Sequence, residues 1–339
     1  MTLLYTEVEE ELRAAVRALL ADRLPPAAVL KRVEGSPYDL DLWKTLAGEI
    51  GVAGLLVPEE YGGAGASAAE VGVVLEELGR GVAPVPFFTS SVLATHALLQ
   101  AGAADLLREL AAGEKTAALV VSFAASPYAP GRGALTGTVT NVAGAEVADV
   151  LLVVVDGTLH QVEGARVEVK PSLDLTRPVA TVTLDGGATP LGPCDLAQTL
   201  RFGAGMLASE QLGVAEWCLD TTLAYVKERH QFARPIGSFQ AVKHRLADLW
   251  LDVVRARAAA RGVIVDPSPR QVAVSQAWNA AVAVHAAEEA LQLHGGIGMT
   301  WEHPIHLYLK RAKATEIALG TPGDHREALA ELADLPGPE

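Results

Sequence analysis

Cationic and imidazole side chains are concentrated between residues 227 and 248: Lys227, Arg229, His230, Arg234, Lys243, His244 and Arg245. Pro235 and Gly237 interrupt the helical pattern there, and Ser238 can cap a second helix that begins at about Phe239. Because the chain carries a net charge of −14, a cluster of this sign indicates an anionic partner. Guanidinium groups bind phosphate in a bidentate manner, so a phosphate-bearing cofactor is one candidate. The alternative is that these charges only complement a helix dipole, and their spacing alone slightly favours that alternative.

Composition excludes several other classes of protein. The 339 residues are 50% hydrophobic and 20% charged, which is typical of a globular protein of two or three domains. An acidic chain is a poor partner for nucleic acid or an anionic membrane. Cys194 and Cys218 have no metal-ligand spacing, so we expect no metal site. Without an apolar run long enough to span a membrane, and with acidic residues in Met1–Leu20, we expect a cytoplasmic protein.

The pattern of apolar residues predicts helices at both ends of the chain. The first 115 residues are expected to form an N-terminal helical domain, with helices at 3–24, 41–50, 68–78, 90–101 and 104–112. Residues 191–339 are expected to form a four-helix bundle, with helices at 195–225, 239–264, 270–293 and 304–319 and a tail helix at 325–332. Asp195 is the expected N-cap of the first bundle helix.

Between these helical regions the pattern changes to β-branched runs of period two. The runs cover residues 118–123, 134–142, 150–155, 159–162, 167–170 and 179–184, and a loop is expected at 186–193. They predict a small antiparallel β-domain at 116–190. The expected fold class is therefore α+β.

Three sequence blocks resemble those of the acyl-CoA dehydrogenase family. The first is R-x-Q-F-x-x-P-I-x-x-F-Q-x-x-K-H-x-x-A-D, from Arg229 to Asp248. The second is Gln292–Glu302 with a later Arg-Ala-Lys at 311–313, and the third is Val57–Gly65 followed by Glu-Glu-Leu-Gly at 76–79. They occur in the family's order and span most of the chain. The resemblance implies the family's three-part fold and an FAD-dependent α,β-dehydrogenation of an acyl-CoA thioester.

The resemblance also implies which residues hold the cofactor. In the family's tetramers the ADP part of each FAD reaches the neighbouring subunit, where it meets the residues that correspond here to Arg229, Gln231, Phe232, Gln292, Gly295 and Gly296. Arginine would pair with the pyrophosphate, and glycines would let the backbone approach it. The glycines could equally form an αL helix cap. Ala233 stands where the family usually has glycine, so a positive φ there would be strained.

Other parts of the family's site are missing. The base is usually a Glu just after the fourth long helix, but this chain has Leu319 there, and the alternative base position falls near Gly203. Glu210 and Glu316 are neighbouring carboxylates, each expected to be a surface or interface residue, with Glu210 kept as an outside candidate for the base. The flavin-binding T-E-P-x-x-G-S-D loop is replaced by Phe123–Pro130, and the β-domain has no tryptophan. His325 is expected to be a surface residue.

This asymmetry resembles the smaller, non-catalytic subunit of actinobacterial α2β2 steroid acyl-CoA dehydrogenases. It implies that a larger partner chain supplies the catalytic Glu, that the substrate is a steroid side-chain CoA, and that an electron-transferring flavoprotein is the acceptor. It also suggests that the vacated half-site leaves room for a bulky acyl group. Two alternatives remain open: a self-sufficient homotetrameric enzyme whose base is Glu210 or Glu316, and a non-enzymatic scaffold on the same fold.

Overall fold

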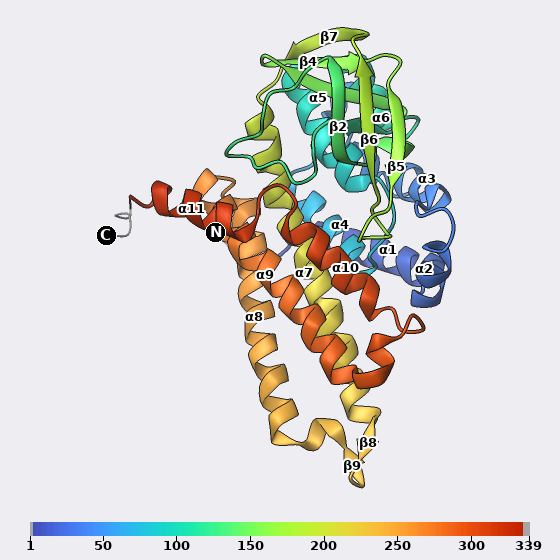
Figure 1. Cartoon of the computed structure of the whole chain (residues 1–339), viewed down its shortest axis with the longest axis vertical. Helices are drawn as coiled ribbons and strands as arrows, with labels where there is room; N and C mark the ends of the chain where they lie inside the picture. The colour runs from blue at the N-terminus through green and yellow to red at the C-terminus, as the bar shows by residue number, and fades with distance from the viewer. Residues whose placement is uncertain (1–2, 335–339) are drawn as a thin grey trace.

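The computed structural model describes residues 3–334, and its N-terminal region is helical. Its helices lie beside the upper half of a long bundle (Figure 1). The predicted helix at 90–101 begins earlier, with a π-helical segment, Phe87–Ala94, whose residues are all buried. The hydroxyl groups of Thr89 and Ser90 form hydrogen bonds there, to the Pro86 carbonyl and from the Ala117 backbone N–H. The helices are α1 (Glu7–Arg23), α2 (Pro26–Arg32), α3 (Leu40–Gly48), α4 (Ala68–Arg80), α5 (Thr95–Ala101) and α6 (Ala104–Ala111).

The β-domain consists of two sheets packed face to face around a small core that includes Val142, Val153 and Val182. One sheet has the order β1-β3-β4-β7 and the other β2-β6-β5. The strands are β1 (Ala117–Leu119), β2 (Thr136–Ala143), β3 (Val150–Val155), β4 (Thr158–Val162), β5 (Arg166–Lys170), β6 (Val179–Asp185) and β7 (Ala188–Pro193).

Two details of the predicted β-domain are wrong. The prediction of a purely antiparallel domain fails because β1 pairs with β3 in parallel, with Ala117 opposite Val150. The segment predicted as the loop 186–193 contains β7, which pairs with β4 and completes the first sheet. Neither pairing leaves a local pattern of side chains, since strand direction and long-range partners depend on the tertiary fold.

The C-terminal helical bundle lies below the β-domain in Figure 1. Its helices are α7 (Leu196–Glu228), α8 (Gln240–Val265), α9 (Pro269–His294) and α10 (Ile305–Glu316), followed by the tail helix α11 (Pro322–Leu332). The prediction for Asp195 is confirmed, since its carboxylate accepts a hydrogen bond from the Gln198 backbone at the start of α7. Small side chains along α9, such as Ala283, Ala286 and Ala290, are buried inside the bundle.

Two glycines let α4 cross α7 in backbone contact. A Cβ added at Gly79 would lie 2.2 Å from the Glu210 carbonyl oxygen, and one at Gly213 would lie 2.0 Å from that of Glu76. The Glu76 carboxylate pairs with Arg13 of α1 at 2.7 Å. The Glu-Glu-Leu-Gly block therefore joins the N-terminal helices to the bundle.

The domain boundaries at 115/116 and 190/191 stay predictions. Within residues 3–334, no helix is long and apolar enough to cross a membrane. The same residues contain no group of three or more His, Cys, Asp or Glu side chains that could hold a metal ion.

Candidate functional site

A β-hairpin projects from the far end of the bundle and carries the first predicted cofactor motif (Figure 1). It consists of β8 (His230–Gln231) and β9 (Arg234–Pro235), and the Ile236 backbone N–H donates to the Arg229 carbonyl at 2.8 Å. Phe232 and Ala233 form its turn with φ angles of 54° and 61°. The positive φ considered for Ala233 is therefore present, and Phe232 adopts one as well.

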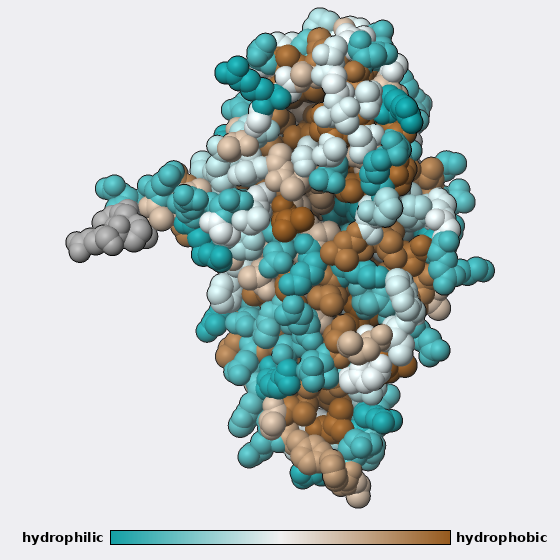
Figure 2. Space-filling view, viewed as in Figure 1, coloured by the Kyte–Doolittle hydropathy of each residue, from teal (hydrophilic) through white to brown (hydrophobic). Residues whose placement is uncertain are grey.

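The side chains of this hairpin point into solvent. Phe232 is 88% exposed, and Figure 2 shows apolar surface at this end of the molecule. Arg229 is exposed and has no ion-pair partner among the described residues, whereas Arg234 stacks on Phe239 at 3.8 Å. The predicted cap is wrong, because the Ser238 hydroxyl donates to the Pro235 carbonyl and does not cap α8. Phe232 itself packs edge-on against Phe239, with ring centroids 6.2 Å apart. The hairpin thus offers an exposed guanidinium, that of Arg229, and an exposed aromatic ring.

The second predicted motif is a glycine-rich turn after α9. Gly295 has φ 62° and ψ −138°, a conformation outside the αL region that is largely restricted to glycine, so the alternative of an αL cap does not hold at Gly295. A Cβ added at Gly295 or Gly296 would meet no atom within 4 Å. Gln292, on the last turn of α9, is exposed too. The backbone of this turn is therefore open to a ligand.

Tyr225 and His294 bring the two motifs to the same end of the bundle. Their rings stack with centroids 4.3 Å apart, and the Tyr225 hydroxyl donates to the His294 carbonyl at 3.3 Å. Tyr225 lies one helical turn before Arg229, and His294 directly precedes Gly295. Sequence reasoning missed both residues, although their positions beside the two motifs were a usable signal.

At the other end of α7, the position expected for the catalytic base is sealed. Leu319 is fully buried with φ 54°, and its backbone N–H donates to the Phe123 carbonyl at 2.9 Å. A Cβ added at Gly203 would lie 3.1 Å from the Leu319 side chain and 2.3 Å from that of Leu93. The cavity beside Leu319 has a volume of only about 10 Å³. The suggested room for a bulky acyl group is therefore wrong at this position, because apolar side chains fill it.

His325, on the tail helix α11, hydrogen-bonds to the residues that fill this position. Its Nε2 lies 3.1 Å from the Leu319 carbonyl oxygen and therefore donates, so Nδ1 accepts from the Tyr128 hydroxyl at 2.9 Å. The expectation of a surface histidine is wrong, since His325 is 0% exposed. Burial lowers the pKa of His325 to about 4. We call this set of residues, Phe123, Tyr128, Leu319 and His325, the sealed half-site.

The carboxylates considered as relocated bases have other partners. Glu210 is buried and receives two hydrogen bonds from Arg177 and one from Arg311 at 3.2 Å. Burial alone would raise the pKa of Glu210, but the two guanidinium groups hold it below its usual value. Glu316 is half-buried and pairs with Lys313 at 3.6 Å. Glu210 is not a surface carboxylate as expected, and its ion pairs leave it a poor proton acceptor.

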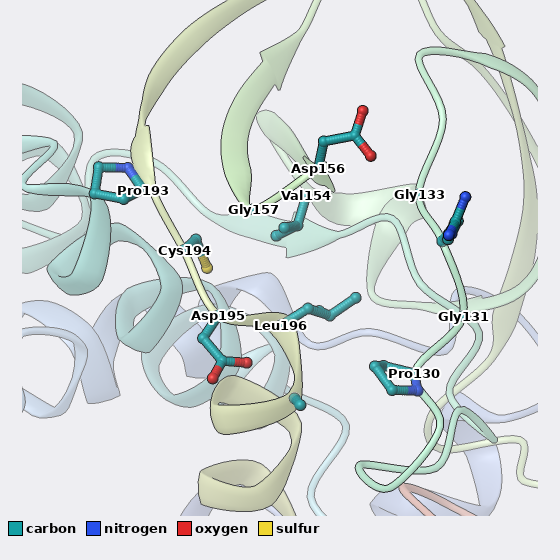
Figure 3. A pocket seen from close by; sticks show the side chains of 12 residues that line it. Pro130, Gly131, Gly133, Val154, Asp156, Gly157, Pro193, Cys194, Asp195 and Leu196 are labelled. Carbon is teal, nitrogen blue, oxygen red and sulfur yellow. The ribbon is translucent and has the colours of Figure 1, made fainter.

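An open cleft beside the β-domain does not resemble a flavin cradle. It has a volume of about 530 Å³ and lies between the β-domain and the start of α7 (Figure 3). No aromatic ring lines it, so it offers no ring on which an isoalloxazine could stack. One of its carboxylates, Asp195, already caps α7. This cleft therefore offers no stacking surface for a flavin ring, whereas the hairpin and the glycine turn expose a guanidinium group and backbone that suit the phosphate-bearing ADP end of FAD.

The chain belongs to the acyl-CoA dehydrogenase family. The family's N-terminal domain matches residues 6–114 and its C-terminal domain matches residues 195–333. The family recognised from the three blocks and the α+β fold class are both confirmed.

Individual proteins match nearly the whole length of this chain. The chain is 40% identical to the acyl-CoA dehydrogenase IpdE2 of Mycolicibacterium smegmatis, over 96% of this chain and 98% of that protein. It is also similar to one chain in the crystal structure of the ChsE4–ChsE5 complex from Mycobacterium tuberculosis. The TM-score is 0.87 at 30% identity, over 99% of this chain and 100% of that chain. The Tcur3481–Tcur3483 steroid ACAD matches with a TM-score of 0.87 and 31% identity, over 97% and 98% of the two chains.

Proposed function

We propose that this chain is the non-catalytic subunit of a two-chain, FAD-dependent acyl-CoA dehydrogenase. The observation that carries the proposal is the contrast between its two half-sites. The exposed hairpin and glycine turn offer Arg229, Phe232 and an open backbone, whereas the base position holds the buried Leu319. A chain with this arrangement can receive one end of a cofactor but cannot remove a proton from a substrate.

The residues at the hairpin and turn would hold the ADP end of FAD. Arg229 would pair with the pyrophosphate, Phe232 would cover the adenine or ribose, and Gly295 and Gly296 would let the backbone approach. Gln231 and Gln292 would add amide donors and acceptors. When bound, FAD supplies the acceptor for the hydride that leaves the β-carbon of the acyl group. The partner chain would provide the flavin-ring cradle and the carboxylate that removes the α-proton.

Similar proteins support a two-chain arrangement and a steroid substrate. Two of the solved relatives are a ChsE4–ChsE5 complex and a steroid ACAD with two named components. FadE34 of Mycobacterium tuberculosis matches 95% of this chain with only 47% of its own length, which leaves room for a second unit of similar size. We therefore propose that the substrate is a steroid-derived acyl-CoA and that the two chains form an α2β2 assembly. We also propose that an electron-transferring flavoprotein accepts the electrons and that the enzyme acts in the cytoplasm.

The two alternatives are less well supported. A self-sufficient enzyme would need a free carboxylate, but Glu210 and Glu316 are both paired. A scaffold protein would have no use for an unpaired Arg229 beside an exposed Phe232.

Co-purification tests the proposal. This chain would be purified alone and with a larger dehydrogenase chain from the same source, and flavin absorbance would be compared with mass from light scattering. We expect flavin only in the mixed complex, at one FAD per pair. Stoichiometric flavin on this chain alone would contradict the proposal.

A matched pair of variants then tests the hairpin. Arg229→Ala should weaken FAD binding to the complex by about 10- to 100-fold, because a hydrogen-bonded charge pair is lost. Lys227→Ala removes a neighbouring exposed cation and should change FAD binding little. Equal effects of the two variants would indicate general electrostatic attraction and would argue against a specific phosphate contact.

A further inference from the structure

Two rings hold the glycine turn against the end of α7. His294 is only 3% exposed, and its Nδ1 lies 2.7 Å from the Ala290 carbonyl oxygen, so Nδ1 carries a proton. Its ring stacks on Tyr225 with an interplanar angle of 21°. Because the Tyr225 hydroxyl also bonds to the His294 carbonyl, a ring stack and a hydrogen bond act at the same place.

A second histidine also contacts the His294 ring. The His303 ring centroid lies 4.7 Å from that of His294, and His303 Nδ1 accepts from the Ile305 backbone at 3.3 Å. His306 packs edge-on against Trp301 with centroids 4.5 Å apart. We call His294, His303 and His306 the imidazole cluster. It links the glycine turn to the start of α10.

The surroundings of the imidazole cluster favour the neutral form of its rings. Within the described residues none of its members forms an ion pair, and His294 Nε2 and both nitrogens of His306 are shielded from solvent without a hydrogen-bond partner. Burial lowers the pKa of all three rings, and mutual repulsion adds to this for His303. The nearest cation, Lys310, lies 3.9 Å from the Trp301 ring centroid and opposes protonation of His306. Within the described residues, a proton added to this cluster would therefore have no ion-pair partner, and Lys310 would oppose it at His306.

We infer that Tyr225 and His294 are positioning residues that fix the glycine turn relative to the Arg229 hairpin. The two segments must face the same phosphate-bearing end of FAD, yet no described backbone hydrogen bond joins them directly. Beyond the packing of α7 against α9, the ring stack and the Tyr225–His294 hydrogen bond are the side-chain contacts that set the turn against the end of α7. The buried, unpaired His294 Nε2 means that this arrangement accommodates a neutral ring. This inference rests on the proposed function, because it assumes that both segments contact one cofactor.

The test measures FAD affinity of the complex with its partner chain, from roughly pH 5 to pH 8, by titrating FAD into the flavin-free complex and following flavin fluorescence. His294→Ala removes the stack and should raise the dissociation constant about 10-fold at neutral pH. In the unaltered complex the affinity should fall on the acid side of the range. His294→Phe keeps a ring on Tyr225 without a titratable nitrogen, so it should bind FAD nearly normally and lose most of that acid-side decline.

Two controls make the outcome decisive. His285 lies exposed on the same helix, and His285→Ala should leave both the affinity and its pH profile unchanged. Tyr225→Leu removes the stack from the other side and should also raise the dissociation constant about 10-fold, which provides a second test if His294→Ala does not fold. An unchanged dissociation constant in Tyr225→Leu would overturn the inference. Arg229→Ala separates the two claims. If Tyr225→Leu binds FAD normally but Arg229→Ala binds it weakly, the inference fails and the proposed function stands. If Arg229→Ala also binds FAD normally, the proposed function fails.

Discussion

The two ends of α7 differ in what their side chains leave available to a ligand. Near its start, the polar groups of the sealed half-site hydrogen-bond to one another. The Leu319 backbone N–H donates to the Phe123 carbonyl, and the Tyr128 hydroxyl bonds to His325 Nδ1. Near its end, Phe232 is exposed, and Arg229 is exposed without an ion-pair partner among the described residues. Under the proposed function, the comparison would mean that a subunit of this family can fill its reaction chamber and still keep a surface for a neighbour's cofactor.

Restoring a carboxylate at the sealed half-site should produce the largest effect. Leu319→Glu places an unpaired charge among buried apolar side chains, so the free energy of unfolding should fall by about 3–5 kcal/mol. Leu319→Met, which conserves volume, should cost less than about 1.5 kcal/mol. Urea denaturation compares the two variants. A stable Leu319→Glu chain that turns over acyl-CoA by itself would show that the chamber is not closed.

A second variant tests whether Glu210 is structural. Glu210→Gln leaves Arg177 and Arg311 without their shared carboxylate, and breaking a buried ion pair costs about 3–5 kcal/mol. We expect lower stability with unchanged FAD affinity in the complex. Loss of dehydrogenation at unchanged stability would instead point to Glu210 as a base.

The sealed half-site should also make stability depend on pH. The pKa of His325 is lowered in the folded chain, so the unfolded chain binds more protons below pH 6.5 and stability falls as the pH drops toward 4. The loss attributable to this ring is on the order of 3 kcal/mol. His325→Gln can still donate to the Leu319 carbonyl without titrating, so unfolding measured over this range should show a shallower slope. An equal slope in both proteins would mean that other groups control the acid response.

The smallest expected effect concerns the exposed hairpin. Ala233 has a positive φ of 61°, which costs an alanine more than a glycine. Ala233→Gly should therefore raise stability by roughly 0.5–1 kcal/mol after the greater flexibility of the unfolded chain is included. Thermal unfolding would detect the gain. A loss of stability would indicate that the hairpin turn relaxes in solution.

Local signals predicted much of this structure. The N-cap at Asp195, the interruption at Pro235 and the absence of a carboxylate at 319 are visible in short stretches of sequence. The overall fold was predicted from the resemblance of three sequence blocks to the acyl-CoA dehydrogenase family. Features that depend on contacts between distant segments could not be read in this way, since neither the parallel β1–β3 pair nor the burial of His325 against Tyr128 leaves a local pattern. The sealed chamber was missed for the same reason.

The most direct test of the account asks which chain each end of FAD touches. The complex would be loaded with FAD carrying a photoreactive azide either on the adenine or on the flavin ring, irradiated, and analysed by peptide mass spectrometry. We predict that the adenine azide labels this chain within residues 229–243 and that the ring azide labels only the partner. Labelling of residues 123–130 of this chain by the ring azide would contradict the account.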